Sequence, residues 1–560
     1  MTATPASGTP SGASALPAAS ALLEVKGLTI RYGRSDDAVV AADALDLTLK
    51  PGEIVALVGE SGSGKSTLAK AIIGLLPESA QIPSGAIRFE GKDLLALSER
   101  QYEQVRGRSI GMVPQDPGAS LDPVKTIESQ VAETFRLHPD GRRRSRAELR
   151  EEVVRLLELV GIDRPRERLK QYPHELSGGL KQRVLIAIAF SLGPRLLIAD
   201  EPTSALDVTV QRTVLEVFGR LARDHGTAVV FVTHDLAVAT DLADRIVVMQ
   251  SGRIREDRPV ADILAAPDHP YTVELLAEAA PAVPAAPAQD AAPVAENAPV
   301  PAIEAVGLTK AFGRGAAEHL AVDGVSFAVR PGTTFALVGE SGSGKSTTAR
   351  MVMRLLDADA GQVRIAGEDV TAVRGAAKRE LWRSLQLVYQ NPDSALDPRL
   401  DITDIVAEPL VNYRIGSRAA RRARVAELLE QVNLPSRLAG LRPRELSGGQ
   451  RQRVAIARAL ALGARTLVLD EALSALDVLT QAQVLELLED LQSRLGLSYL
   501  FISHDLHVVE RISHDVGVMR RGKLVETGPT DRVFANPQSE YTSLLLESNP
   551  GHRLRELAAR

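Results

Sequence analysis

The sequence of 560 residues predicts a three-layer α/β fold that occurs twice in tandem. The first observation is a duplication, since Gly59–Thr67 recurs letter for letter at Gly339–Thr347. The second is a set of short, continuous apolar runs at equivalent places in both halves, which is typical of parallel strands buried on both faces. The third is the helical pattern between these runs, which places helices on both faces of each sheet.

Composition divides the chain into four segments. Residues 1–21 are almost entirely Ala, Ser, Thr, Pro and Gly, which predicts a disordered tail. Residues 22–278 form the first predicted domain and residues 302–560 the second. Between them, residues 279–301 are rich in Ala and Pro, a composition that predicts a semi-extended linker.

The bulk composition excludes several classes of function. The net charge of −5 gives no basic field for nucleic acid, and 3% aromatic residues argue against a stacking platform for single strands. The absence of cysteine excludes disulfides, cysteine zinc sites and iron–sulfur clusters. No apolar run is long enough for a membrane helix. We therefore expect a cytosolic protein that reaches a membrane only through partners.

Three apolar runs in each half predict the strands of the parallel sheet. In the first half these runs are Ile54–Val58, Leu196–Ala199 and Val229–Val232, and in the second half they are Phe335–Val338, Leu467–Leu469 and Tyr499–Ile502. Ligands of such sheets bind at the carboxyl ends of the strands, so polar residues that follow these runs are the candidates for a site.

The duplicated segment matches the phosphate-loop pattern G-x-x-x-x-G-K-[ST] and directly follows the first run of each half. Glycines let backbone N–H groups approach phosphates, the lysine reaches the β- and γ-phosphates, and the following serine ligates Mg²⁺. The pattern predicts two sites for ATP with Mg²⁺. The predicted phosphate-binding residues are Gly59, Ser61, Gly62, Gly64, Lys65, Ser66 and Thr67, with Gly339, Ser341, Gly342, Gly344, Lys345, Ser346 and Thr347.

Adjacent carboxylates end the second run of each half, in Asp200-Glu201 and Asp470-Glu471. Successive residues that leave a strand point in different directions, so we assign the aspartates to Mg²⁺ and the glutamates to the attacking water. His234 and His504 end the third run at the same sheet edge, where a histidine can sense the γ-phosphate.

A Ser-Gly-Gly sequence starts a helical stretch in each half and is a second candidate for anion binding. Taken alone, it is more often only a helix N-cap and turn. Its members are Ser177, Gly178 and Gly179, with Leu180 next, and Ser447, Gly448, Gly449 and Gln450.

Taken together, these motifs resemble the nucleotide-binding domains of ABC ATPases, in family order and over nearly the whole chain. The resemblance implies a RecA-like parallel-sheet core with an antiparallel β subdomain and a helical subdomain. It implies that Gln115 and Gln390 are glutamine-loop residues, catalytic and ligands of Mg²⁺. Asp207 and Asp477 would contact nucleotide, and the aromatic rings of Tyr32 and Phe312 would stack on adenine.

The segments Gln115–Pro123 and Gln390–Pro398, with the tails His269–Thr272 and Ser539–Thr542, more narrowly resemble the oligopeptide/dipeptide/nickel importer ATPases. That resemblance implies a peripheral subunit at the cytoplasmic face of the membrane. Its partners would be two polytopic permease subunits and a solute-binding protein, without nucleic acid or direct cargo contact. Peptide, glutathione, nickel and peptide-like antibiotics all remain open as cargo.

The family pattern places each ATP between one half's phosphate loop and the other half's Ser-Gly-Gly signature. Site one would join the Lys65 loop to Ser447–Gln450, and site two the Lys345 loop to Ser177–Leu180. Site two combines two departures from the pattern, because Leu180 replaces Gln and Ala472-Leu473 replaces Pro-Thr. We expect site two to be retained but weaker.

Two other readings compete with the importer. A soluble twin-cassette ATPase acting on ribosomes or DNA usually has a charged helical linker or zinc-binding cysteines, and this chain has neither. A sugar importer with fused cassettes lacks the Asp/Asn-Pro…Leu-Asp-Pro form of the glutamine loop.

Overall fold

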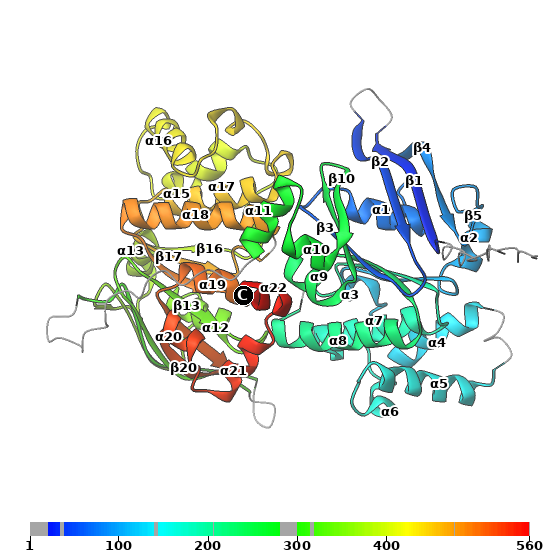
Figure 1. Ribbon diagram of the computed structural model, residues 1–560. Helices are drawn as coiled ribbons and strands as arrows, with labels where there is room; N and C mark the ends of the chain where they lie inside the picture. The colour runs from blue at the N-terminus through cyan, green and yellow to red at the C-terminus, as the bar shows by residue number, and fades with distance from the viewer. Residues whose placement is uncertain are drawn as a thin grey trace, which may run out of the picture.

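The computed structural model describes residues 21–33, 38–138, 144–204, 206–279, 299–313, 319–474 and 476–558. Residues 1–20 of the predicted tail and 280–298 of the predicted linker lie outside the described residues. The two halves lie side by side, the first running from blue to green and the second from yellow-green to red (Figure 1). The predicted α/β class and its duplication are confirmed, since each half has the same pair of sheets.

The larger sheet of each half has six strands, with the order β10-β9-β3-β8-β7-β6 in the first half and β20-β19-β13-β18-β17-β16 in the second. All neighbours pair in parallel except the antiparallel edge strands β10 and β20. The strands of the first sheet are β3 (Ile54–Val58), β6 (Ile110–Val113), β7 (Leu196–Asp200), β8 (Ala228–Val232), β9 (Arg245–Gln250) and β10 (Arg253–Pro259). Those of the second are β13 (Thr334–Val338), β16 (Leu385–Val388), β17 (Thr466–Asp470), β18 (Ser498–Ile502), β19 (Asp515–Arg520) and β20 (Lys523–Pro529).

A smaller four-stranded antiparallel sheet accompanies each core, with the orders β2-β1-β4-β5 and β12-β11-β14-β15. Its strands are β1 (Leu23–Tyr32), β2 (Val39–Leu49), β4 (Ala80–Phe89) and β5 (Lys92–Asp93), then β11 (Ile303–Phe312), β12 (His319–Val329), β14 (Ala360–Ile365) and β15 (Glu368–Asp369).

Both faces of the central strand β3 are buried, which explains its unbroken apolar sequence. Ile54, Ala56 and Val58 pack on one side with the helical layer. Val55 and Leu57 pack on the other side with α1 and the antiparallel sheet. Alternate residues of one strand therefore belong to two separate cores, the arrangement of a three-layer domain.

The helices of the first half are α1 (Lys65–Ile72), α2 (Glu99–Val105), α3 (Pro117–Ser120), α4 (Ile127–Leu137), α5 (Arg146–Leu159), α6 (Pro165–Arg168), α7 (Gly178–Phe190), α8 (Val208–Asp224), α9 (Leu236–Leu242), α10 (Val260–Ala265) and α11 (Pro270–Ala279). Those of the second are α12 (Lys345–Val352), α13 (Gly375–Ser384), α14 (Pro392–Ala395), α15 (Ile402–Asn412), α16 (Arg418–Gln431), α17 (Gly448–Leu460), α18 (Val478–Leu495), α19 (Leu506–Ile512), α20 (Thr530–Ala535), α21 (Glu540–Glu547) and α22 (His552–Ala558). Within the described ranges, none of these helices combines the length and apolar character that crossing a membrane requires.

Candidate functional site

The phosphate loops connect the central strand of each large sheet to the helix that follows it, β3 to α1 and β13 to α12. A Cβ atom at Gly59 would lie 2.0 Å from the carbonyl oxygen of Met249. The same atom at Gly339 would lie 2.2 Å from that of Met519. The first residue of each loop must therefore be glycine, because the loop runs against the backbone of the neighbouring strand.

The loop lysines are buried and bent back over their own loops. Lys65 Nζ donates to the carbonyl oxygens of Gly59 and Glu60, at 2.7 and 2.8 Å. Lys345 makes the equivalent two bonds at 2.7 and 2.9 Å. Burial lowers the pKa of both lysines, although nearby carboxylates, with Glu201 and Glu471 the largest of these, oppose the shift.

The residue after each lysine reaches the aspartate at the end of the neighbouring strand. Ser66 Oγ donates to Asp200 Oδ1 at 2.8 Å, and Ser346 Oγ donates to Asp470 Oδ1 at 3.0 Å. Burial raises the pKa of both aspartates, while the serine bond opposes that rise. The structure thus brings together two oxygen-bearing residues that the sequence assigned to Mg²⁺.

The glutamate after each aspartate lies between a glutamine and a histidine. Glu201 Oε2 accepts from Gln115 Nε2 at 2.9 Å and lies 3.3 Å from His234 Nδ1. The corresponding distances from Glu471 Oε2 are 2.7 Å to Gln390 and 3.6 Å to His504. Residues from three strand ends therefore meet at one carboxylate in each half.

These glutamates are held in a strained and electrostatically defined setting. Their φ angles are 45° and 48°, in the left-handed region that non-glycine residues rarely adopt. Burial raises the pKa of Glu201, but the hydrogen bond and charge of His234 and the charge of Lys65 outweigh it and leave that pKa below its ordinary value. For Glu471 the hydrogen bond from His504 is the main cause of the same lowering.

The histidines show the matching shift. Burial lowers the pKa of His234, yet the hydrogen bond and charge of Glu201 more than reverse this and raise it overall. Glu471 raises the pKa of His504 in the same way. Each pair therefore favours a charged imidazole beside a charged carboxylate.

Both predicted signature segments begin helices, α7 and α17. Ser177 Oγ accepts from the backbone N–H of Leu180 at 3.4 Å, and Ser447 Oγ accepts from that of Gln450 at 3.3 Å. Gln450 Oε1 also accepts from the Ser447 N–H at 3.0 Å, which completes a capping box. Leu180 has no side-chain acceptor, so α7 begins with the serine cap alone.

The second glycine of each signature is required by packing. A Cβ atom at Gly179 would lie 2.2 Å from Val210 Cγ1, and one at Gly449 would lie 2.3 Å from Thr480 Cγ2. These contacts press the signature helix against α8 or α18, which Asp207 and Asp477 cap. For a Cβ atom at Gly178 or Gly448, the nearest atom among the described residues would be 3.5 Å away.

The two predicted adenine-stacking residues differ in their surroundings. The hydroxyl oxygen of Tyr32 lies 3.2 Å from Thr67 Oγ1 in the phosphate loop. Phe312 has no hydroxyl, its side chain is 46% exposed, and Lys310 Nζ lies 5.9 Å from its ring centroid. In the part of the chain that the structure describes, the first half ties this ring to its loop and the second does not.

A cavity of about 510 Å³ lies between the two halves and brings together predicted site residues from both of them. Both glutamates, both glutamines and both histidines line it. Among the described residues, neither signature serine belongs to its lining. The lining residues used above are Ser61, Gln115, Glu201, Asp207 and His234, with Ser341, Lys345, Gln390, Glu471, Asp477 and His504.

The hydroxyl of Thr209, on the capped helix of the first half, lies 3.1 Å from Glu340 Oε1 in the loop of the second and shares its single proton between that oxygen and Asp207 Oδ1 at 2.9 Å. Leu479 occupies the equivalent place in the second half and packs against the apolar core of the first. The sequence pattern assigned no role to these residues, because a contact between distant segments has no local signature.

Two tyrosines were also missed as part of the site. The backbone N–H of Glu60 donates to the hydroxyl of Tyr271 at 2.9 Å, and that of Glu340 donates to Tyr541 at 3.1 Å. Burial raises the pKa of each hydroxyl to about 12, so both remain protonated. Their repeated Tyr-Thr sequence was the available signal. Each fixes its own phosphate loop from the tail of the same half.

Comparison with protein families gives two matches. The protein-family model described as ABC transporter matches residues 42–204 and again 322–474, so it covers the phosphate loop and the Asp-Glu pair of each half. A second model, described as the C-terminal region of oligopeptide/dipeptide transporters, matches residues 525–558.

Three similar proteins extend over nearly the whole chain. The peptidoglycan transport ATP-binding protein YejF of Agrobacterium fabrum is 46% identical, covering 94% of this chain and 96% of that protein. The oligopeptide transport ATP-binding protein OppD of Mycobacterium tuberculosis is 41% identical, covering 95% and 98%. The glutathione import ATP-binding protein GsiA of Salmonella typhimurium is 42% identical, covering 94% and 89%.

Proposed function

Because this chain belongs to the ABC transporter family, we propose that it is the ATP-hydrolysing subunit of an importer for oligopeptides, dipeptides or related peptide-like solutes. The observation that carries the proposal is the meeting of Gln, Glu and His beside a phosphate loop in both halves. A single such cluster could be structural, but its repetition with matching distances supports a duplicated chemical site.

Each phosphate loop binds the phosphates of one ATP through its backbone N–H groups and its lysine. The lysine already lies over the loop, where its ammonium group donates to two carbonyl oxygens. When ATP binds, a bond to a phosphate oxygen would replace these two bonds. Tyr271 and Tyr541 each accept a hydrogen bond from one backbone N–H of their loop, which fixes the loop so that its other N–H groups keep their direction. The aromatic rings of Tyr32 and Phe312 stack on the adenine.

Hydrolysis begins with a water held by the glutamate at the γ-phosphate. The water oxygen bonds to phosphorus while the bond from phosphorus to the β–γ bridging oxygen breaks, and the proton of the water passes to the carboxylate. His234 and His504 orient that carboxylate and contact the γ-phosphate. The lowered pKa of each glutamate keeps it ionised, which is the state that a proton acceptor requires.

The residues present fit Mg²⁺. Ser66 Oγ and Asp200 Oδ1 lie within 2.8 Å of each other, and Ser346 and Asp470 repeat the pair. Within the described residues there is no cluster of three or more His, Cys, Asp or Glu suited to a metal. Gln115 and Gln390 would add an amide oxygen. When bound, the ion neutralises charge that develops on the phosphates.

We further propose that each ATP lies between the loop of one half and the signature of the other. Asp207 and Asp477 support this arrangement, because their charges act on the pKa of the opposite loop lysine. The Thr209–Glu340 bond holds α8, the helix against which the first half's signature packs, next to the phosphate loop of the second half. Signature N-termini of α7 and α17 then supply N–H groups to the phosphates.

The partners that this function requires are two polytopic permease subunits and a solute-binding protein, with the chain held peripherally at the cytoplasmic face of the membrane. The relatives support this assignment, because their names describe ATP-binding proteins for the transport or import of peptidoglycan, oligopeptide or glutathione. All three cargoes are peptide-containing, so a peptide-like cargo is the shared chemistry. None of these three names describes an ATPase that acts on ribosomes or DNA.

Native purification of the tagged chain from gently solubilised membranes tests the proposal. Mass spectrometry should identify two polytopic membrane proteins and a solute-binding protein, and the complex should release phosphate from ATP only while Mg²⁺ is present. Ribosomal proteins or DNA in place of membrane subunits would overturn the transport assignment. Hydrolysis that persists after chelation of Mg²⁺ would overturn the metal assignment.

A further inference from the structure

Two short helices leave the candidate sites directly behind the histidines. α9 begins two residues after His234, and Asp235 caps it by accepting from the N–H of Val238 at 3.2 Å. α19 begins two residues after His504 and is capped by Asp505 in the same way. Because so short a link joins each histidine to its helix, a displacement of one is passed to the other.

The tail of the second half holds the helix of the first. Asp241, near the end of α9, accepts three backbone N–H bonds from the segment that enters α22, from Gly551 at 2.8 Å and from His552 and Arg553 at 3.2 Å each. A Cβ atom at Gly551 would lie 3.2 Å from Ala237 Cβ on α9. Figure 1 shows the red α22 lying against the first half beside α9.

The tail of the first half holds the helix of the second by different chemistry. Arg511 on α19 occupies the place equivalent to Asp241, and its Nη1 lies 3.0 Å from Oε2 of Glu278 on α11. Two carboxylates of its own half are farther away, Glu489 at 3.4 Å and Glu486 at 3.8 Å. α11 also packs against α18, so the crossed tail is anchored along its length.

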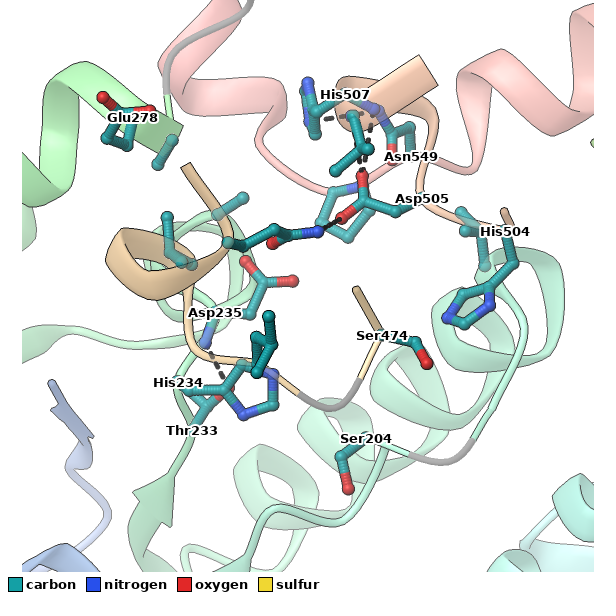
Figure 2. A pocket seen from close by; sticks show the side chains of 18 of the residues that line it. Ser204, Thr233, His234, Asp235, Glu278, Ser474, His504, Asp505, His507 and Asn549 are labelled. Carbon is teal, nitrogen blue, oxygen red and sulfur yellow. Dashed lines mark hydrogen bonds between the residues drawn. The ribbon is translucent and has the colours of Figure 1, made fainter. Parts of the chain in front are cut away.

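The crossed tails and the two histidines face a common hollow. A cavity of about 410 Å³ is lined by His234 and His504 together with Glu278, Arg511 and Asn549. Figure 2 shows Glu278 and Asn549 on the tail side and both histidines on the opposite side. Asn549 Nδ2 also lies 3.0 Å from Nε2 of His507, which ties the second tail to α19 as well.

We propose that Asp241 and Arg511 are positioning residues that couple the two ATP sites, each by tying the helix behind one histidine to the tail of the other half. The proposal rests on the proposed function only in requiring that both halves bind ATP. Closure around one nucleotide moves its histidine and helix, and the crossed tail transfers that movement to the other half. Hydrolysis is then cooperative in ATP, with a Hill coefficient between 1 and 2.

Phosphate release by the full chain over a range of ATP concentrations tests the coupling. Glu278→Gln removes the negative charge that Arg511 meets across the halves, and Asp241→Ala removes the three acceptor bonds. In each we expect the Hill coefficient to fall to about 1 while maximal turnover stays within about threefold. The matched controls are Glu486→Gln, which removes a negative charge that Arg511 meets within the same half, and Asp262→Ala on an exposed turn of α10. Both controls should keep the wild-type coefficient.

Several results would overturn the coupling proposal: an unchanged coefficient in Glu278→Gln and Asp241→Ala, an equal fall in Glu486→Gln, or a wild-type coefficient of 1 in a chain that hydrolyses ATP. Absence of ATP hydrolysis by the wild-type complex would instead refute the proposed function. If Asp241→Ala lowers the melting temperature by more than a few degrees, Asp241→Asn takes its place. It loses the charge and one of the two acceptor oxygens, so the Hill coefficient should fall in the same direction by a smaller amount.

Discussion

The two halves agree closely inside their sites and differ where they meet. The serine–aspartate distances are 2.8 and 3.0 Å and the glutamine–glutamate distances 2.9 and 2.7 Å. At the boundary, Thr209 corresponds to Leu479 and Asp241 to Arg511. The comparison teaches that duplication has kept the chemistry within each half, whereas what each half gives the other has diverged.

The largest expected effect comes from removing the catalytic carboxylates one at a time. Glu201→Gln should reduce phosphate release by about 100-fold or more, the range for a lost general base. Glu471→Gln should reduce it by about twofold at most, because site two pairs with the signature that contains Leu180 and already contributes little. Steady-state turnover at saturating ATP measures both. Equal losses, or the reverse order, would contradict unequal sites.

The next effect tests whether the tail tyrosines support the two loops equally. Tyr271→Phe and Tyr541→Phe each leave a loop N–H without its acceptor, which costs about 1–3 kcal/mol. We expect ATP affinity at the affected site to fall about tenfold, measured by equilibrium binding of a fluorescent nucleotide. Tyr541 also stacks under Arg520, with 4.6 Å from the guanidinium carbon to the ring centroid, so its ring stays in place without the hydroxyl. Unchanged affinity in both variants would remove the tyrosines from the site.

The sequence alone predicted the parts of the fold and the site that depend on local pattern. Apolar runs gave the strands of the large sheets, and the order of the motifs placed Ser66, Asp200 and Glu201 at one sheet edge, where the structure has them. It did not predict the bond from the Glu60 N–H to Tyr271, because residues more than two hundred positions apart leave no periodic signal. The hydrogen bonds that Asp241 accepts from the backbone of residues 551–553 were missed for the same reason.

A smaller effect should follow from exchanging the residue that separates the two signatures. Leu180→Gln restores the capping box that Gln450 makes in the second half and should raise turnover about two- to threefold. Gln450→Leu should lower turnover by a similar or greater factor, since it acts on the stronger site. Phosphate release under identical conditions compares them. If Leu180→Gln leaves turnover unchanged or lowers it, Leu180 does not explain a weaker site.

The smallest effect concerns the single hydrogen bond from Thr209 to Glu340. Thr209→Val removes this bond, together with the bond from the same hydroxyl to Asp207, with little change in volume. It should weaken ATP binding at site two about two- to fivefold, in line with about 0.5–1 kcal/mol for one partly buried bond. Leu479→Thr, which offers the equivalent hydroxyl to Glu60, should strengthen site one by a similar factor. Nucleotide titrations of chains with the other loop lysine changed to alanine separate the two sites. If Thr209→Val instead changes the ATP affinity of site one, or Leu479→Thr that of site two, the proposed pairing of each helix with the opposite loop is contradicted.

The central claim is that one polypeptide carries two ATP sites that close between its halves. The direct measurement is the amount of ATP retained per chain by the double variant Glu201→Gln/Glu471→Gln after gel filtration in Mg²⁺, with the mass of the eluting species determined in the same run. The account predicts two ATP molecules per chain in a species that contains a single copy of the chain. One ATP per chain, or retention only by an assembly of two or more copies, would contradict it.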